Sequence, residues 1–296
     1  MPAQLPEAGA VFLDHVAHFV PEMDAAAAAL ERCGFRLTLF TAQTNRVDGT
    51  PVPAGTGNRC AMFRRGYVEI LAATGDTPLA RQLNERLARH VGLHLAAFSS
   101  ADAAAEHHRL GEAGFPVLPV VDMRRPVATV SGEEEARFTI ARIAPGPMSE
   151  GRVQFLTHHT ERLVWREPDL DHPNGAQALE AVWIAAADPS EPAARFERFT
   201  GRPATRDGAV TTIALERGAL RFAAPEFLAS EIGIASGPPL PYLAGCEIEV
   251  ASLDRLRRHL DHAGLAHRAA ADGEALQLPP SVGGTILFRA GSAELV

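Results

Sequence analysis

Four polar side chains occupy matching places in two repeats of the N-terminal half of the sequence. His15 in LDHVAHFV and His94 in VGLHLAAF lie 19 and 20 residues before the glycine that ends the next predicted helix. Glu69 in YVEIL and Gln154 in RVQFL occupy the same slot of their apolar runs. Two imidazoles, a carboxylate and an amide oxygen are donor types that suit Mn, Fe, Co, Ni or Zn. What they do depends on the elements that carry them.

The sequence contains four copies of one small plan, in which a strand is followed by a helix and by further short strands. The first two copies begin with LDHVAHFV and VGLHLAAF, and the last two with LEAVWIAAAD and GCEIEVAS. The helices follow as MDAAAAALERCGF, SADAAAEHHRLGEAGF, SEPAARFERFTG and LDRLRRHLDHAG. An average copy of about 74 residues is close to what a βαβββ module needs. We therefore predict an α+β fold of four βαβββ modules.

Each predicted helix has residues suited to its two ends. Short polar side chains accept hydrogen bonds from the free amides of a first turn, and glycine adopts the left-handed conformation that follows a last turn. The predicted N-terminal side chains are Asp24, Asp102, Ser190 and Asp254. The predicted C-terminal glycines are Gly34, Gly114, Gly201 and Gly264.

The clearest interruption of this pattern is WREPDLDHPNG at residues 165–175. Two prolines, acidic residues and an Asn-Gly pair stop all periodicity in this segment. We predict an N-terminal domain over residues 1–165 and a C-terminal domain over residues 166–296.

Paired βαβββ modules are similar to the vicinal oxygen chelate superfamily, which includes glyoxalase I, extradiol dioxygenases and fosfomycin-resistance proteins. More narrowly, LDHVAHFVPEMDAA, GTGNRCAMFRRGYVEIL and HHTERLVW followed by HPNGA resemble the family of glyoxalase-like domain proteins. The resemblance implies that the four modules form two domains of the glyoxalase, or vicinal oxygen chelate, type.

The resemblance also implies a metal site, because a divalent metal in this superfamily is held by the first and last strands of two paired modules. Matching strand to strand gives the metal ligands His15, Glu69, His94 and Gln154, with Glu69 also catalytic. Methylmalonyl-CoA epimerase is similar in using two His, one Glu and one Gln, although Glu and Gln would exchange modules here. The general base of that enzyme or of glyoxalase I therefore cannot be transferred.

Two details leave the chemistry open. Without Gln154 the set becomes two His and one carboxylate, which is the arrangement of non-haem iron oxygenases. The corresponding slots of the C-terminal pair are Ala181, Arg221, Cys246 and Leu287, which cannot make a normal divalent site. We expect that pair to support the first, to close its cup, or to form the surface of a homodimer.

Three further side chains are candidates for substrate binding. Asn58 and Arg59 in GTGNRC could meet an anionic substrate through forked hydrogen bonds, or could fix a loop and lie exposed. His158 follows Gln154 at the strand exit and could line the mouth of a pocket.

Composition excludes several classes of protein. The net charge is −8, and the short basic runs disfavour nucleic-acid or anionic-membrane binding. All 28 basic residues are arginine, which excludes Schiff-base and P-loop lysines. The three cysteines, Cys33, Cys60 and Cys246, form no CxxC pair and are expected to be reduced core thiols. No apolar run is long enough for a membrane span, and Arg32 is the first basic residue, so we expect a cytoplasmic protein.

Three functions remain in order of preference. The first is a metal-dependent lyase or isomerase that transfers a proton next to a carbonyl group of a small oxygen-rich metabolite, with stabilisation of an enolate or enediolate. The second is an extradiol-type dioxygenase. The third is a metal-free small-molecule binding protein, which the aromatic content of 6% disfavours.

Overall fold

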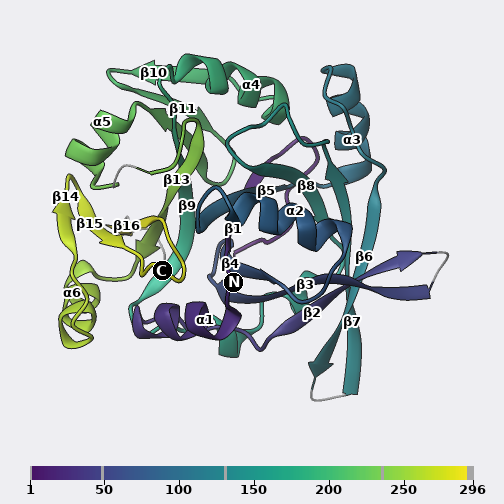
Figure 1. Ribbon diagram of the computed structural model, residues 1–296, viewed down its shortest axis with the longest axis horizontal. Helices are drawn as coiled ribbons and strands as arrows, with labels where there is room; N and C mark the ends of the chain where they lie inside the picture. Colours follow the sequence, from purple (N-terminus) through teal and green to yellow (C-terminus); the bar gives the residue numbers. More distant parts are fainter. Residues whose placement is uncertain (1, 48–49, 130–131, 235–236, 292–296) are drawn as a thin grey trace.

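The computed structural model describes residues 2–47, 50–129, 132–234 and 237–291, which form two eight-stranded mixed sheets side by side (Figure 1). The strand order of the first sheet is β2-β3-β4-β1-β5-β8-β7-β6, and that of the second is β10-β11-β12-β9-β13-β16-β15-β14. The elements of the first sheet are β1 (Phe12–Phe19), α1 (Met23–Arg32), β2 (Thr41–Val47), β3 (Thr50–Met62), β4 (Tyr67–Ala73), α2 (Pro78–Leu87), β5 (Gly92–Ser99), α3 (Ala103–Glu112), β6 (Val121–Thr129), β7 (Gly132–Arg142) and β8 (Arg152–His158).

The chain then crosses to the second sheet through two short 3-10 helices. The crossing and the second sheet comprise η1 (Glu161–Leu163), η2 (Glu167–Asp169), β9 (Ala176–Ala185), α4 (Ser190–Thr200), β10 (Ala204–Asp207), β11 (Val210–Ala214), β12 (Ala219–Ala223), α5 (Pro225–Phe227), the π-helical turn η3 (Leu228–Ile232), β13 (Tyr242–Val250), α6 (Leu253–His262), β14 (Arg268–Ala270), β15 (Gly273–Gln277) and β16 (Thr285–Ala290). No helix of the described residues is both long and apolar enough to span a membrane.

The predicted α+β class with four βαβββ modules is confirmed. In every module the first strand pairs in parallel with the last strand, as in β1 with β4 and β5 with β8. The first strands of two modules pair antiparallel at the centre of each sheet, as β1 does with β5 and β9 with β13. Each sheet therefore has an approximate two-fold arrangement about its centre.

The predicted helix ends are right at the C-termini and mostly wrong at the N-termini. The four glycines Gly34, Gly114, Gly201 and Gly264 all have positive φ angles. Asp102 caps α3, since its side chain accepts from the amides of Ala104 and Ala105 at 2.9 and 3.0 Å. The other three predicted caps, Asp24, Ser190 and Asp254, lie inside their helices. Side-chain periodicity locates a helix but leaves its first residue uncertain by one or two positions.

The segment between the sheets is fixed by buried hydrogen bonds. His172 Nε2 lies 2.7 Å from the carbonyl oxygen of Met62, and Asn174 Nδ2 donates to the carbonyl of Cys33 at 3.0 Å. Arg65 binds the carboxylates of Glu180 and Glu249 in the second sheet at 2.7 and 3.0 Å. The HPNGA segment thus ties the second sheet to the first. The three cysteines are free and buried, as predicted.

Two long hairpins cover the concave face of the first sheet. Figure 1 shows the β2–β3 and β6–β7 hairpins projecting from the same side of the molecule. They meet where the Thr44 hydroxyl donates to the carbonyl oxygen of Arg124 at 3.4 Å. Side chains of β2 and β6 therefore close a cavity over the strands at the centre of the sheet.

Candidate active site

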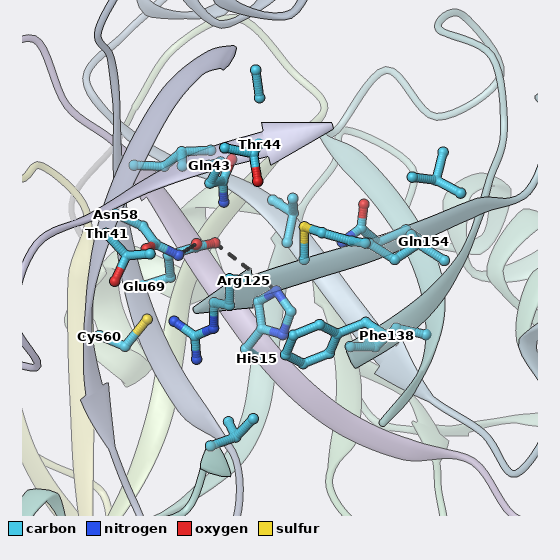
Figure 2. Close-up of a pocket in the computed structure, with 18 of the residues that line it drawn as sticks. His15, Thr41, Gln43, Thr44, Asn58, Cys60, Glu69, Arg125, Phe138 and Gln154 are labelled. Atoms are coloured by element: carbon cyan, nitrogen blue, oxygen red, sulfur yellow. Dashed lines mark hydrogen bonds and ion pairs between the residues drawn. The ribbon is translucent and has the colours of Figure 1, made fainter. Parts of the chain in front are cut away.

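The concave face of the first sheet holds a cavity of about 100 Å³. Three of the four predicted metal ligands, His15, Glu69 and Gln154, line it (Figure 2). They come from β1, β4 and β8, so the sheet brings together residues that are far apart in the sequence. Apolar side chains such as Leu95 and Phe138 form much of the remaining wall.

A fully buried carboxylate fixes the ring of His15. Asp14 Oδ1 lies 2.7 Å from His15 Nδ1, and Asp14 Oδ2 lies 2.9 Å from His158 Nε2. Burial raises the pKa of Asp14, but the charge of His158 and the hydrogen bonds from both histidines outweigh it and hold the pKa well below its usual range. Because an ionised carboxylate only accepts, the proton of His15 lies on Nδ1. The Tyr67 ring stacks on His15 at 4.3 Å and further restricts it.

His15 and Glu69 face each other without a hydrogen bond. His15 Nε2 lies 3.9 Å from Glu69 Oε2, as Figure 2 shows with a dashed line. Glu69 Oε1 accepts a hydrogen bond from Asn58 Nδ2, so one carboxylate oxygen is held and the other faces His15. Asn58 also lines the cavity, from β3, which places this predicted substrate-binding residue beside the carboxylate. An imidazole and a carboxylate at this distance can both reach one small ligand.

His94 does not join this site, and its prediction as a ligand is wrong. It is the extra residue of a β-bulge, since Ala17 pairs with Leu95 and His18 with Leu93. Its ring packs 4.0 Å from the ring of His90, and its Nε2 lies 2.8 Å from the carbonyl oxygen of that residue. It is not among the described residues that line the cavity.

Leu95 occupies the slot that corresponds to His15. His15 pairs with Tyr67 and Leu95 pairs with Arg152 in the two parallel ladders, while Glu69 and Gln154 each lie two residues farther along. Counting residues back from the helix-ending glycine moved this slot by one residue, because the bulge lies between.

Two other predicted site residues lie elsewhere. The Arg59 side chain binds the carbonyl oxygen of Thr38 at 2.8 Å and the carboxylate of Glu31 at 2.9 Å, and it does not line the cavity. His158 is buried behind the cavity with Asp14 rather than at a pocket mouth. Its role is to orient Asp14, and through it His15.

Arginines in the cavity wall are the residues that the sequence analysis missed. Arg125, Arg142 and Arg152 are half-buried, and the part of the chain that the structure describes gives none of them an ion pair. Burial, followed by the charge of Arg142, lowers the pKa of Arg152 to about 10. Glu69 is the one carboxylate that lines the cavity within the described residues. Strand alternation could have revealed Arg152, which lies two residues before Gln154 and hence on the same face.

The donor set does not fit the predicted four-ligand metal site. Within residues 2–47, 50–129, 132–234 and 237–291, no group of three or more His, Cys, Asp and Glu side chains is arranged to hold a metal ion. His15 and Glu69 are strong donors, the Gln154 amide is a weak one, and Leu95 offers none. The Oε1 atom of Gln154 is buried without a hydrogen-bond partner. Nearby guanidinium groups would also repel a divalent cation.

The second sheet has no comparable site, as predicted, but one of its slots was misassigned. Cys246 packs in the core cluster, and Glu247, its neighbour, pairs with Ala181 across β13 and β9. Glu247 binds Arg221 at 3.2 Å. Irregular register on both sides of this stretch shifts the alternation by one residue.

The comparison with protein families decides the relationship. The family described as "Glyoxalase-like domain" matches residues 13–200, which include the first sheet, β9 and α4. The chain belongs to the glyoxalase-like domain family. No curated protein matches this glyoxalase-like protein at a significant level.

Solved structures show the same fold. A hypothetical protein from Staphylococcus aureus has a TM-score of 0.68 and 12% identity, covering 95% of this chain and all of that one. The Mn(II)-bound glyoxalase from Novosphingobium aromaticivorans has a TM-score of 0.54 and 10% identity, covering 95% and 82% of the two chains. A catechol 2,3-dioxygenase has a TM-score of 0.55 and 14% identity, covering 99% and 97%. The glyoxalase-like protein therefore has the fold of the vicinal oxygen chelate superfamily.

Proposed function

We propose that this glyoxalase-like protein is an enzyme that transfers a proton next to a carbonyl group of a small, oxygen-rich anion, without a step at a metal ion. The observation that carries the proposal is the pair formed by His15 and Glu69, whose Nε2 and Oε2 atoms face each other at 3.9 Å. Each member is held from behind, His15 by Asp14 and Glu69 by Asn58. Preorganised groups of this kind need little rearrangement during reaction.

Glu69 is the proton acceptor in this scheme. Its free oxygen, Oε2, takes the proton from the carbon beside the substrate carbonyl, and the electron pair of that C–H bond moves to the carbonyl oxygen. The protonated Glu69 then returns the proton to a neighbouring carbon in an isomerisation, or the enolate expels a leaving group in a lyase reaction. Asn58 leaves Oε2 free by binding the other oxygen.

His15 stabilises the negative oxygen of the enolate. Its Nδ1 proton binds Asp14, so its Nε2 atom is the one available to the substrate. The imidazolium form donates a hydrogen bond from Nε2, and the ionised Asp14 stabilises that form in a buried setting. Arg125, Arg142 and Arg152 add positive charge along the cavity wall. The site therefore favours an anionic substrate over a neutral one.

The donor set supports the two other predicted functions less well. An extradiol-type dioxygenase would need two imidazoles and a carboxylate on iron, and His15 and Glu69 supply one of each. A pure binding protein has no need of a free carboxylate oxygen facing a fixed imidazole. The divalent metal remains a prediction from the sequence, for which this pocket offers two strong donors.

Hydrogen exchange at carbon tests the proposal. The full chain, dialysed against a chelator, is incubated in D₂O with a panel of small 2-oxo and 3-oxo carboxylates, and loss of the C–H signal is followed by proton NMR. We expect catalysed exchange for one or more compounds, and a fall of about 10²-fold or more in Glu69→Gln. Glu112→Gln, an exposed change on α3, is the matched control and should leave the rate unchanged.

Two results would contradict the proposal. Equal exchange rates in Glu69→Gln and the unmodified chain would remove Glu69 from the chemistry. Loss of exchange after chelation, with recovery on adding Mn²⁺, would replace the proposal with the metal-dependent reaction that was predicted from the sequence.

A further inference from the structure

A second cavity lies beside the first and shares part of its wall. Its volume is about 380 Å³, and the side chains common to both cavities are Leu71, Leu79, Arg142 and Arg152. The first cavity alone, at about 100 Å³, is smaller than the 300–1,000 Å³ typical of ligand sites. The two together fall within that range.

The shared wall carries positive charge that the described chain does not neutralise. Arg86 of α2 lines the second cavity with Arg142 and Arg152. None of these three arginines has an ion pair or a side-chain hydrogen bond with the described residues, and the Nε atom of Arg142 is buried without a partner. Glu85 is the one acidic side chain among the described residues that line this cavity.

Their mutual repulsion supports this description. Burial lowers the pKa of Arg142, and burial followed by the charge of Arg89 lowers the pKa of Arg86. Arg152 is affected by both of its neighbours, Arg142 and Arg86. All three groups remain charged at neutral pH, so they lie close enough to repel one another without a compensating anion.

Other partly buried arginines of this protein have carboxylate partners. Arg195 binds Glu150 and Glu191, and Arg65 binds Glu180 and Glu249. A partly buried guanidinium without such a partner is costly, and the cost falls when an anion binds. The exception at Arg86, Arg142 and Arg152 therefore indicates a site for an external anion.

We propose that Arg142, Arg152 and Arg86 form a subsite for a second oxyanion group of the substrate, a phosphate monoester or an additional carboxylate. The proposal rests on the proposed function and deepens it. The reacting carbonyl lies between His15 and Glu69 in the first cavity, and the remote anionic group lies in the second. The substrate is thus a carbonyl compound with an anionic group at the end remote from the reacting carbons.

Anion titration of the full chain tests the subsite. Inorganic phosphate and succinate are titrated separately by isothermal calorimetry at constant ionic strength. We expect saturable binding of at least one probe, about tenfold to a hundredfold weaker in Arg152→Met and in Arg142→Met. Arg152→Lys should restore part of the affinity. Arg81→Met is the matched control, because Arg81 is on the same helix as Arg86 but is exposed and paired with Asp76.

The probes and variants separate the outcomes. Binding of phosphate alone assigns a phosphate ester, and binding of succinate assigns a second carboxylate. His15→Ala should bind the probe as the unmodified chain does, so failure of the proton-transfer chemistry leaves the subsite testable. Should a methionine variant not fold, protection of backbone amides at residues 142–153 by the probe, measured by hydrogen exchange, takes its place. No saturation with either probe, or unchanged affinity in both methionine variants, would overturn the subsite.

Discussion

The concave faces of the two sheets treat buried charge in opposite ways. In the second sheet Glu247 is 1% exposed and binds Trp183 Nε1 at 2.8 Å, Arg221 at 3.2 Å and Arg289 at 3.4 Å. Apolar side chains such as Leu228 from the segment of α5 and η3 pack in the same cluster. In the first sheet the arginines lack partners and a cavity remains. The same architecture thus carries an internally neutralised core in one half and a receptive pocket in the other.

The largest expected effect lies in the second sheet. Glu247→Ala leaves two guanidinium groups and an indole N–H without their partner, so we expect a loss of about 2 to 3 kcal/mol in the free energy of unfolding. The Arg221 side chain is 33% exposed, which keeps the loss below that of a fully buried pair. Glu69→Ala should cost less than about 1 kcal/mol. Urea unfolding measures both, and equal losses would end the contrast between the two faces.

The buried carboxylate of the first sheet gives a pH-dependent effect. The folded-state pKa of Asp14 is below its unfolded value of about 3.9, so its contribution is present above that pH and is lost as the pH falls below it. Asp14→Asn should cost about 2 kcal/mol at pH 7. The difference from the unmodified chain should shrink below about pH 4. Unfolding curves at pH 7, 5 and 3 check this, and a constant difference would contradict it.

Removing an arginine should have opposite signs in the two sheets. Arg152→Met removes a charge without a partner and should stabilise the chain by up to about 1 kcal/mol in the absence of anions. Arg289→Met removes a partner of Glu247 and should destabilise it by about 1 kcal/mol. Thermal unfolding in a phosphate-free buffer compares them. Destabilisation by both changes would show that Arg152 has a structural role.

The smallest effect is expected from divalent metals. Excess Mn²⁺ or Zn²⁺ should raise the free energy of unfolding by less than about 0.4 kcal/mol, the value for a ligand at a concentration equal to its Kd. His15→Ala is the control, since it removes one of the two strong donors. A clear rise in the midpoint that His15→Ala abolishes would restore the metal site.

The sequence was sufficient for the architecture, because repeated strand-helix patterns and the helix-ending glycines do not depend on the positions of single residues. It located His15, Glu69 and Gln154 correctly because each lies in a strand whose alternation is regular up to that point. It failed at His94 and Cys246, next to register shifts that reverse which face a side chain takes.

Two features of the site could not be read from the residues alone. The hydrogen bond of Asn58 to Glu69 depends on adjacent strands that are paired in one particular register. The unpaired state of Arg142 and Arg152 depends on the absence of nearby carboxylates among the described residues, which is a property of the folded chain.

The two modules of the first sheet have divided their labour. His15 and Glu69 come from the first module, whereas Gln154, Arg142 and Arg152 come from the second. Reactivity and recognition therefore reside on separate halves of a duplicated unit. Substitutions in β7 and β8 can alter which metabolite is accepted while the proton-transfer pair stays intact, so this scaffold can diversify in specificity without rebuilding its chemistry.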